Sequence, residues 1–175
     1  MPRILIPTPD EAPAGSQAVL LAVKAKLGQV PNFFRVLSNS PAVLGAHAAL
    51  SQNLGKALDL KTRERIALAV AAVNGCEYCN AAHSFTGFSF ARLSHEEIAL
   101  AREGKAADAK DSAAVGFARR VAEARGKVSP EDLAAVRDAG FSDAQIVEIV
   151  ATVAENFFTN LINNVAATPV DFPAI

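Results

Sequence analysis

Both cysteines of this 175-residue chain lie in one short stretch, Gly75-Cys76-Glu77-Tyr78-Cys79-Asn80-Ala81-Ala82-His83. The two thiols are three positions apart, and His83 follows four positions after Cys79. Thiols at this spacing can close a small disulfide ring and reopen it, which is the chemistry that a redox site needs. On a helix each residue advances by about 100°, so Cys76, Cys79 and His83 fall at about 0°, 300° and 340°. The spacing therefore predicts a redox site on one face of a helix.

The attacking form of a cysteine is the thiolate, and a free thiol with a pKa near ~8.5 is mostly protonated at neutral pH. Two features of the stretch would lower that pKa. Gly75 places Cys76 at the start of a helix, where the positive end of the helix dipole favours an anion. His83 lies one turn after Cys79 and can accept its proton directly or through one water. The first feature favours Cys76 as the attacking thiol, whereas the second favours Cys79, which we rank first.

A histidine in this role needs a partner that fixes its tautomer, and Glu64 is the candidate. It belongs to the preceding predicted helix. The break at Asn74-Gly75 would let the two helices fold back on each other, so that Glu64 faces His83. The flanking Arg63 and Arg65 leave open the alternative that Glu64 belongs to a surface ion pair.

Helical patterns cover almost all of the chain after a proline-rich start. Residues 1–15 hold four prolines and predict an extended arm, which is mobile unless a neighbour holds it. No stretch alternates with the period of a strand, so the chain is predicted to be all-α, with short connections and antiparallel neighbouring helices. Caps and breakers predict eight helices. The first four run from a Ser16 cap to Leu27, within 40–56, from an Asp59 cap over Leu60 to Val73, and from Cys76 to about Phe90. The other four run from a Ser94 capping box to about Gly104, from Asp111 to Arg125, from Ser129 to before Gly140, and from a Ser142 capping box through Leu161.

The length favours a single domain with a sizeable core. We expect an arm at 1–15, a helical domain at 16–168 whose core motif is 60–90, and an irregular tail at 169–175. Hydrophobic residues make up 51% of the chain and charged residues 20%, with a net charge of −1. This composition excludes a disordered chain and gives no sign of a nucleic-acid or membrane-surface partner.

The start of the chain is too short and proline-broken for a signal peptide, and no apolar run approaches the ~20 residues of a membrane span. We therefore expect a cytoplasmic protein. In that compartment a close cysteine pair is more often catalytic or metal-binding than a structural staple.

The segment 63–83, Arg-Glu-Arg-Ile-Ala-Leu-Ala-Val-Ala-Ala-Val-Asn-Gly-Cys-Glu-Tyr-Cys-Asn-Ala-Ala-His, resembles the alkylhydroperoxidase D-like core of the carboxymuconolactone decarboxylase-like superfamily. Glu64, both cysteines and His83 fall at the spacing of that family. A weaker resemblance to its peroxidase-related branch extends to 30–34, to 139–143 and to 156–164. The resemblance thus covers most of residues 28–165.

The resemblance implies an all-helical subunit of the alkylhydroperoxidase D-like type that assembles into trimers or hexamers and needs no cofactor. Carried over to this chain, it implies that Cys79 is the peroxidatic thiol, that Cys76 resolves its sulfenic acid as a disulfide, and that His83 and Glu64 relay the proton. The family's prototype has a second histidine between the cysteines, where this chain has Tyr78. Because tyrosine is a poor base near neutral pH, Tyr78 is only an accessory candidate, and the substrate could differ.

We therefore predict a thiol-dependent peroxidase that reduces hydrogen peroxide or an organic hydroperoxide. Its electron donor would be a thiol or dithiol, such as a lipoylated protein, a thioredoxin-like protein or a small thiol. One alternative is a reductase of protein or small-molecule disulfides. Others are carboxymuconolactone-type lactone chemistry, which does not need a cysteine pair, and a non-enzymatic thiol sensor or metal-binding module.

Simpler interpretations of the same residues stay open. Cysteines at helical spacing are often plain core residues. Two cysteines and a histidine also supply three zinc-type ligands, with Glu64 or a water as the fourth. His47 is interpreted as an ordinary packed or surface residue and His95 as a solvated capping residue. Phenylalanines are more typical of a core, although Phe85 and Phe88 follow the site closely enough to line an apolar channel.

Overall fold

The computed structural model describes residues 1–175 and is all-α, as the sequence predicted. None of its helices combines the length and the apolar character needed to cross a bilayer. Short connections join the nine helices, which are α1 (Ala14–Leu27), α2 (Asn32–Leu37), α3 (Pro41–Leu54), α4 (Leu60–Val73), α5 (Glu77–Ser89), α6 (His95–Arg102), α7 (Ala109–Ala124), α8 (Pro130–Asp138) and α9 (Asp143–Ala166).

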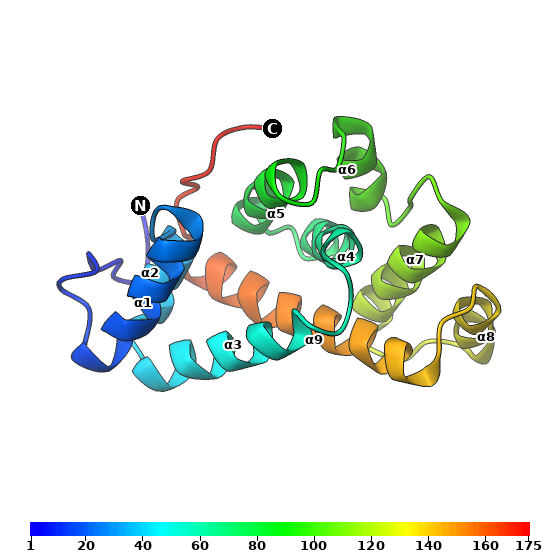
Figure 1. Cartoon of the computed structure of the whole chain (residues 1–175), viewed down its shortest axis with the longest axis horizontal. Coiled ribbons are helices and arrows are strands. Elements are labelled where there is room, and N and C mark those ends of the chain that lie inside the picture. The colour runs from blue at the N-terminus through cyan, green and yellow to red at the C-terminus, as the bar shows by residue number, and fades with distance from the viewer.

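Helix α4 lies at the centre of the fold and contacts α5, α6, α7 and α9 (Figure 1). Every residue from Ile66 to Ala71 is at most 2% exposed. This stretch is therefore apolar on all sides, as expected of a helix that other helices enclose. The same helix carries Glu64 two residues earlier, so the fold takes this carboxylate into the interior of the molecule.

Arg65 ties α4 to two of its neighbours. Its guanidinium lies 2.9 Å from Oε1 of Glu97 on α6 and 2.5 Å from Oδ2 of Asp111 on α7. The side chain of Arg65 is 7% exposed, and a buried charge of this kind requires such partners. The alternative in which Glu64 belongs to a surface ion pair with this arginine is therefore wrong, because both residues are buried and Arg65 is paired elsewhere.

The predicted caps around the cysteine motif are confirmed. Asp59 caps α4, and the Ser94 and Ser142 capping boxes open α6 and α9. Gly75 has a φ of 60°, in the left-handed region that favours glycine. This residue reverses the chain between α4 and α5 and leaves Cys76 at the N-cap of α5.

The predicted start of α1 is wrong. Ser16 was expected to cap the helix, but α1 begins at Ala14 after Pro13, and Ser16 is fully buried in its first turn. Its Oγ instead donates a 2.8 Å hydrogen bond to the backbone oxygen of Ser38, at the end of α2. A serine hydroxyl serves equally well as a cap or as a donor in a tertiary contact, and the local sequence does not distinguish the two.

Both chain ends are attached to α2, which lies beside α1 (Figure 1). In the N-terminal arm, the backbone oxygens of Ile6 and Pro7 accept hydrogen bonds from the Arg35 guanidinium at 3.1 and 2.8 Å. In the irregular tail, Oδ2 of Asp171 accepts a 2.7 Å bond from the backbone N–H of Asn32. The arm, predicted to be mobile unless a neighbour holds it, is held.

Candidate active site

The two cysteines form a disulfide at the beginning of α5. Their Cα atoms are 5.3 Å apart, and Cys76 and Cys79 are 0% and 2% exposed. As the N-cap residue, Cys76 accepts a hydrogen bond from the backbone N–H of Cys79 at 3.2 Å on its sulfur. After reduction, the same N–H and the positive end of the helix dipole would favour a thiolate at Cys76.

His83 and Glu64 are in direct contact across the α4–α5 hairpin. Nδ1 of His83 lies 2.9 Å from Oε2 of Glu64, as expected from the fold-back at Gly75. The same carboxylate oxygen accepts a 2.5 Å hydrogen bond from Oγ1 of Thr86, one turn further along α5. Because Nδ1 donates to Glu64, Nε2 is the ring nitrogen that is free to exchange a proton. The catalytic roles of these residues stay predictions.

Carboxylates control the protonation of His83. Burial by itself would lower its pKa, but the carboxylates of Glu64 and Glu155 outweigh that effect and raise the pKa above its usual value. Glu155 lies on α9 and was not singled out from the sequence. Burial raises the pKa of Glu155, against the opposing effects of Ser51, His83 and Arg63.

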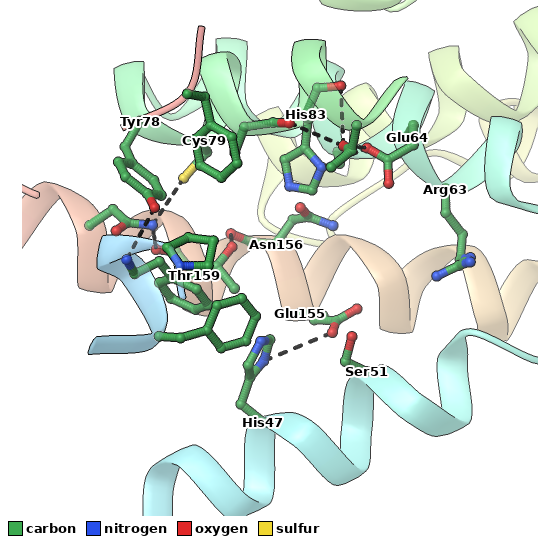
Figure 2. Close-up of a pocket in the computed structure, with 18 of the residues that line it drawn as sticks. His47, Ser51, Arg63, Glu64, Tyr78, Cys79, His83, Glu155, Asn156 and Thr159 are labelled. Carbon is green, nitrogen blue, oxygen red and sulfur yellow. Dashed lines mark hydrogen bonds and ion pairs between the residues drawn. The ribbon is translucent and has the colours of Figure 1, made fainter. Parts of the chain in front are cut away.

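These side chains meet at a cavity of about 220 Å³ between α3, α5 and α9. Figure 2 shows Cys79 and His83 on one side of it and His47, Ser51 and Glu155 on the other. Cys79 lines the cavity, whereas Cys76 does not. A small molecule in this space can therefore contact one sulfur of the disulfide and the His83 ring together.

Helix α9 supplies one wall of the cavity through a row of polar residues. Asn163 is 4% exposed, and its Nδ2 lies 3.4 Å from the sulfur of Cys79. The sequence placed this asparagine only within a stretch of family resemblance and gave it no role. A signal was nevertheless present, because the cavity-lining polar residues of α9 recur at helical spacing, namely Thr152, Glu155, Asn156, Thr159 and Asn163.

The sequence also missed the residues opposite the cysteines. His47 on α3 was interpreted as ordinary, yet it is 8% exposed and lines the cavity together with Ser51 and Arg63. His47 packs at 5.2 Å, between ring centroids, from Phe33. No local pattern connects α3 with the cysteine motif, because only the packing of α3 on α9 brings them together.

Tyr78, the residue that replaces the prototype's histidine, is a structural link. Its hydroxyl donates to Oδ1 of Asp171 at 2.9 Å and accepts from the backbone N–H of Phe33 at 3.1 Å. Burial, and secondarily the charge of Asp171, raise the pKa of Tyr78 well above its usual value. The hydroxyl therefore fastens the tail and α2 to α5 and does not serve as a base.

The aromatic residues of the cavity are not the ones that the sequence favoured. Phe85 packs against Phe90 and Phe172, and Phe88 is 40% exposed and stacks on His95. Neither lines the cavity, so the channel suggested for Phe85 and Phe88 is wrong. The aromatic walls come from elsewhere in the chain, namely Phe33, Phe34, Tyr78 and Phe172.

The structure does not support the metal-binding alternative. No group of three or more His, Cys, Asp or Glu side chains is arranged to hold a metal ion. The two cysteine sulfurs are bonded to each other, and Nδ1 of His83 is bonded to Glu64. The arrangement is a disulfide beside a histidine whose ring is bonded to a carboxylate.

Comparisons with known proteins agree with this arrangement. The model of the carboxymuconolactone decarboxylase family matches residues 41–124, which run from α3 through α7 and contain all four predicted catalytic residues. No curated protein sequence gives a significant match.

Among solved structures, a peroxidase-related protein with an alkylhydroperoxidase D core from Ralstonia eutropha JMP134 is 28% identical, with a TM-score of 0.86. The match covers 97% of this chain and 92% of that one. A peroxidase-related protein from Silicibacter sp. TM1040 is 24% identical, with a TM-score of 0.83 over 96% of this chain and 91% of that one. The debrominase Bmp8 is 18% identical, with a TM-score of 0.77 over 90% and 87%. These last two likenesses concern the fold alone.

The fold, the cysteine motif and its buried glutamate–histidine contact define a class of all-helical proteins with a Cys-x-x-Cys site. Residues 41–124 of the chain match the carboxymuconolactone decarboxylase family, and the fold is similar to that of the protein with an alkylhydroperoxidase D core.

Proposed function

We propose that this protein is a thiol-dependent peroxidase that reduces a hydroperoxide at Cys79. The observation that carries the proposal is that Cys79, disulfide-bonded to Cys76, faces a cavity that His83 also lines, with the His83 ring fixed by Glu64. The family match and the peroxidase-related relative from Ralstonia eutropha support the class of chemistry.

Cys79 attacks first because it is the cysteine that contacts the cavity. In the reduced protein, Nε2 of His83 accepts the thiol proton, and Glu64 stabilises the imidazolium. The thiolate then attacks the hydroperoxide ROOH, so that an S–O bond forms while the O–O bond breaks. Cys79 becomes a sulfenic acid, and the departing RO⁻ takes the proton from His83 to give the alcohol ROH.

Cys76 closes the cycle. Its thiol attacks the sulfenic sulfur of Cys79, water leaves, and the disulfide forms. A donor thiolate then attacks Cys79, and Cys76 departs as a thiolate that the helix N-terminus stabilises. A second donor thiol releases Cys79, and the donor leaves as its own disulfide. Each turnover reduces one hydroperoxide to an alcohol and water and oxidises two donor thiols.

The burial of both sulfurs restricts the electron donor. A small thiol, or a dithiol on a narrow arm such as the lipoyl group of a lipoylated protein, can reach Cys79 through the cavity. A folded thioredoxin-like protein would need the cavity to open. The same burial disfavours folded protein disulfides as substrates, which weighs against that form of disulfide reductase. The reducing cytoplasm that we expect for this protein would supply such thiols.

We further propose that subunits associate, as the family's trimers or hexamers do. Helix α9 exposes Val147, Leu161 and Val165, each at 59% to 67%. Leu21 on α1 is 66% exposed. Exposed apolar residues that recur along one helix mark association surfaces. The mass of the particle in solution, measured by light scattering during size-exclusion chromatography, tests this expectation.

The consumption of hydrogen peroxide and of cumene hydroperoxide, with dithiothreitol as the donor, tests the proposed reaction. The wild type should turn over and Cys79→Ser should not. Cys76→Ser, which cannot form the internal disulfide, should accumulate a sulfenic acid at Cys79 when peroxide is added without donor. His95→Phe, changed outside the cavity, should match the wild type. Equal turnover by the wild type and Cys79→Ser would exclude the mechanism. Mass spectrometry that found a sulfenate on Cys76 in Cys79→Ser, and none on Cys79 in Cys76→Ser, would reverse the two roles.

A further inference from the structure

His47 holds a buried ring nitrogen that has no hydrogen-bond partner. The residue is 8% exposed and lines the cavity on the side opposite Cys79 (Figure 2). Its Nδ1 is unpaired, and Oε1 of Glu155 lies 3.9 Å away, too far for a hydrogen bond. Buried polar atoms in proteins are rarely without a partner, so this nitrogen calls for an explanation.

Three aromatic rings fix the position of the His47 ring. The ring centroids of Phe33, Phe34 and Phe158 lie 5.2, 6.1 and 5.8 Å from that of His47. Burial lowers the pKa of His47, so the imidazole is neutral near neutral pH. A neutral imidazole has one donor and one acceptor nitrogen and therefore suits an uncharged polar group.

The gap between His47 and Glu155 matches one oxygen atom. An oxygen placed about 2.8 Å from both Nδ1 and Oε1 would form an angle of about 90° with them, which a hydroxyl can satisfy by donating to one atom and accepting from the other. Arg63 and Glu155 line the same cavity with opposite charges. A carboxylate in the gap would be repelled by Glu155, which borders it. The gap therefore favours a hydroxyl over a carboxylate.

The rest of the space favours a compact apolar body. Phe33, Phe34 and Phe172 form aromatic parts of the wall, and the volume is about 220 Å³. An apolar cavity of ~150 Å³ is sufficient to bind benzene. One ring with small substituents therefore fits, with its far end toward Cys79 and His83.

We propose that His47 and Glu155 bind the hydroxyl group of a compact, uncharged, single-ring molecule inside this cavity. This proposal rests on the proposed function only in identifying the bound molecule as the hydroperoxide substrate or its alcohol product. The pair would then select hydroxylated ring hydroperoxides over unsubstituted ones. The binding itself does not depend on peroxidase activity.

Isothermal titration calorimetry with 4-ethylphenol and ethylbenzene tests the site directly, because the two probes differ only by a hydroxyl. The wild type should bind 4-ethylphenol about 10-fold more tightly. His47→Phe keeps the aromatic packing, and Glu155→Met keeps the side-chain length. Each should reduce the affinity ratio to ~3 or less, since each removes one hydrogen-bond partner. A purely structural role would change both affinities alike and leave the ratio intact.

His95→Phe is the matched control, because His95 is exposed and stacks on Phe88 outside the cavity. It should leave both affinities unchanged. Equal affinities for the two probes in the wild type would overturn the proposal and leave the gap to a water molecule. A ratio that survives in both His47→Phe and Glu155→Met would also overturn it. Peroxide consumption by the wild type and Cys79→Ser on the same preparations is a separate test. If the wild type and Cys79→Ser consume peroxide equally, the proposed peroxidase function is excluded. A preference of the wild type for 4-ethylphenol supports the hydroxyl site whether or not the protein is a peroxidase.

Discussion

The side-chain amide of Asn163 donates to the sulfur of Cys79 across the interface between α9 and α5, with 3.4 Å between Nδ2 and Sγ. A second bond, from the same Nδ2 to the backbone oxygen of Thr159 at 3.0 Å, holds the amide in this orientation. A donor aimed at sulfur stabilises a thiolate more than a thiol. We therefore expect Asn163 to stabilise a thiolate at Cys79, the cysteine that faces the cavity.

Replacing Asn163 with leucine should make Cys79 less reactive. Loss of a hydrogen bond to a charged group costs about 1.5 kcal/mol, which corresponds to a rise of about one unit in the pKa of the thiol. The rate of the peroxide reaction near neutral pH should fall about tenfold. Ultraviolet absorbance of the thiolate during a pH titration, in a Cys76→Ser background, measures the pKa of Cys79.

Asn164→Leu is the control, because Asn164 bonds to the backbone oxygen of Asn74 and not to sulfur. It should leave the pKa of Cys79 in place. An unchanged pKa in Asn163→Leu would show that the contact in the oxidised structure has no counterpart in the reduced protein.

The Glu64–His83 contact predicts how stability depends on pH. Burial opposes the charged ring, but the carboxylates of Glu64 and Glu155 raise the pKa of His83 above its usual value. A raised folded-state pKa adds stability that is fully present below the unfolded-state pKa of ~6.5 and is lost as the pH rises through the folded-state value. Glu64→Gln should remove most of this contribution, so its deficit in the free energy of unfolding should be larger at about pH 6 than at about pH 9.

Urea unfolding at the two pH values, with the disulfide intact, measures that difference, and an NMR titration of the His83 ring measures its pKa. The pKa should fall in Glu64→Gln. Glu103→Gln, at an exposed glutamate that pairs with Lys105 and not with His83, should change neither quantity. If the loss in free energy of unfolding in Glu64→Gln were larger at pH 9 than at pH 6, the raised pKa of His83 would be contradicted.

The sequence predicted the part of the site that depends on local geometry. Asp59, Gly75 and the cysteine spacing are local signals, and together they define two helices, the reversal between them and the approach of Glu64 to His83. Helix period and cap chemistry act over a few residues, so a single sequence records them directly.

The opposite wall could not be predicted in the same way. His47 and Asn163 reach the cysteines only because α3 and α9 pack beside α5 and α4, and no local rule specifies that packing. Asp171 is a similar case, because it accepts a hydrogen bond from the hydroxyl of Tyr78, which lies 93 positions earlier in the chain. The polar residues of α9 were visible at helical spacing, but what they face is decided by tertiary structure.

Tyr78→Phe should weaken the attachment of the tail more than the chemistry. The change removes the bonds of the hydroxyl to Asp171 and to the backbone N–H of Phe33, which together contribute about 1 to 3 kcal/mol. Hydrogen exchange of residues 168–175 should become faster, and the midpoint of urea unfolding should fall. Peroxide turnover per folded molecule should change less than about threefold, because a hydroxyl held this way does not exchange protons in the reaction. A large loss of turnover at unchanged stability would instead place Tyr78 in the reaction.

Gly75 and Gly45 form a matched pair that tests the turn before the cysteines. An added Cβ meets no atom within 4 Å at either position, so steric crowding does not distinguish them. Gly75 has a φ of 60°, where an L-residue costs about 1 kcal/mol or more, whereas Gly45 lies inside α3, where alanine is favoured by about 1 kcal/mol. Gly75→Ala should therefore lower the free energy of unfolding and Gly45→Ala should raise it, as measured by urea denaturation.

Because Gly75 directly precedes the N-cap cysteine, Gly75→Ala should also change the rate at which dithiothreitol reduces the disulfide. Gly45→Ala should leave that rate unchanged. Equal and favourable effects of both variants on stability would show that the left-handed turn at Gly75 is not required.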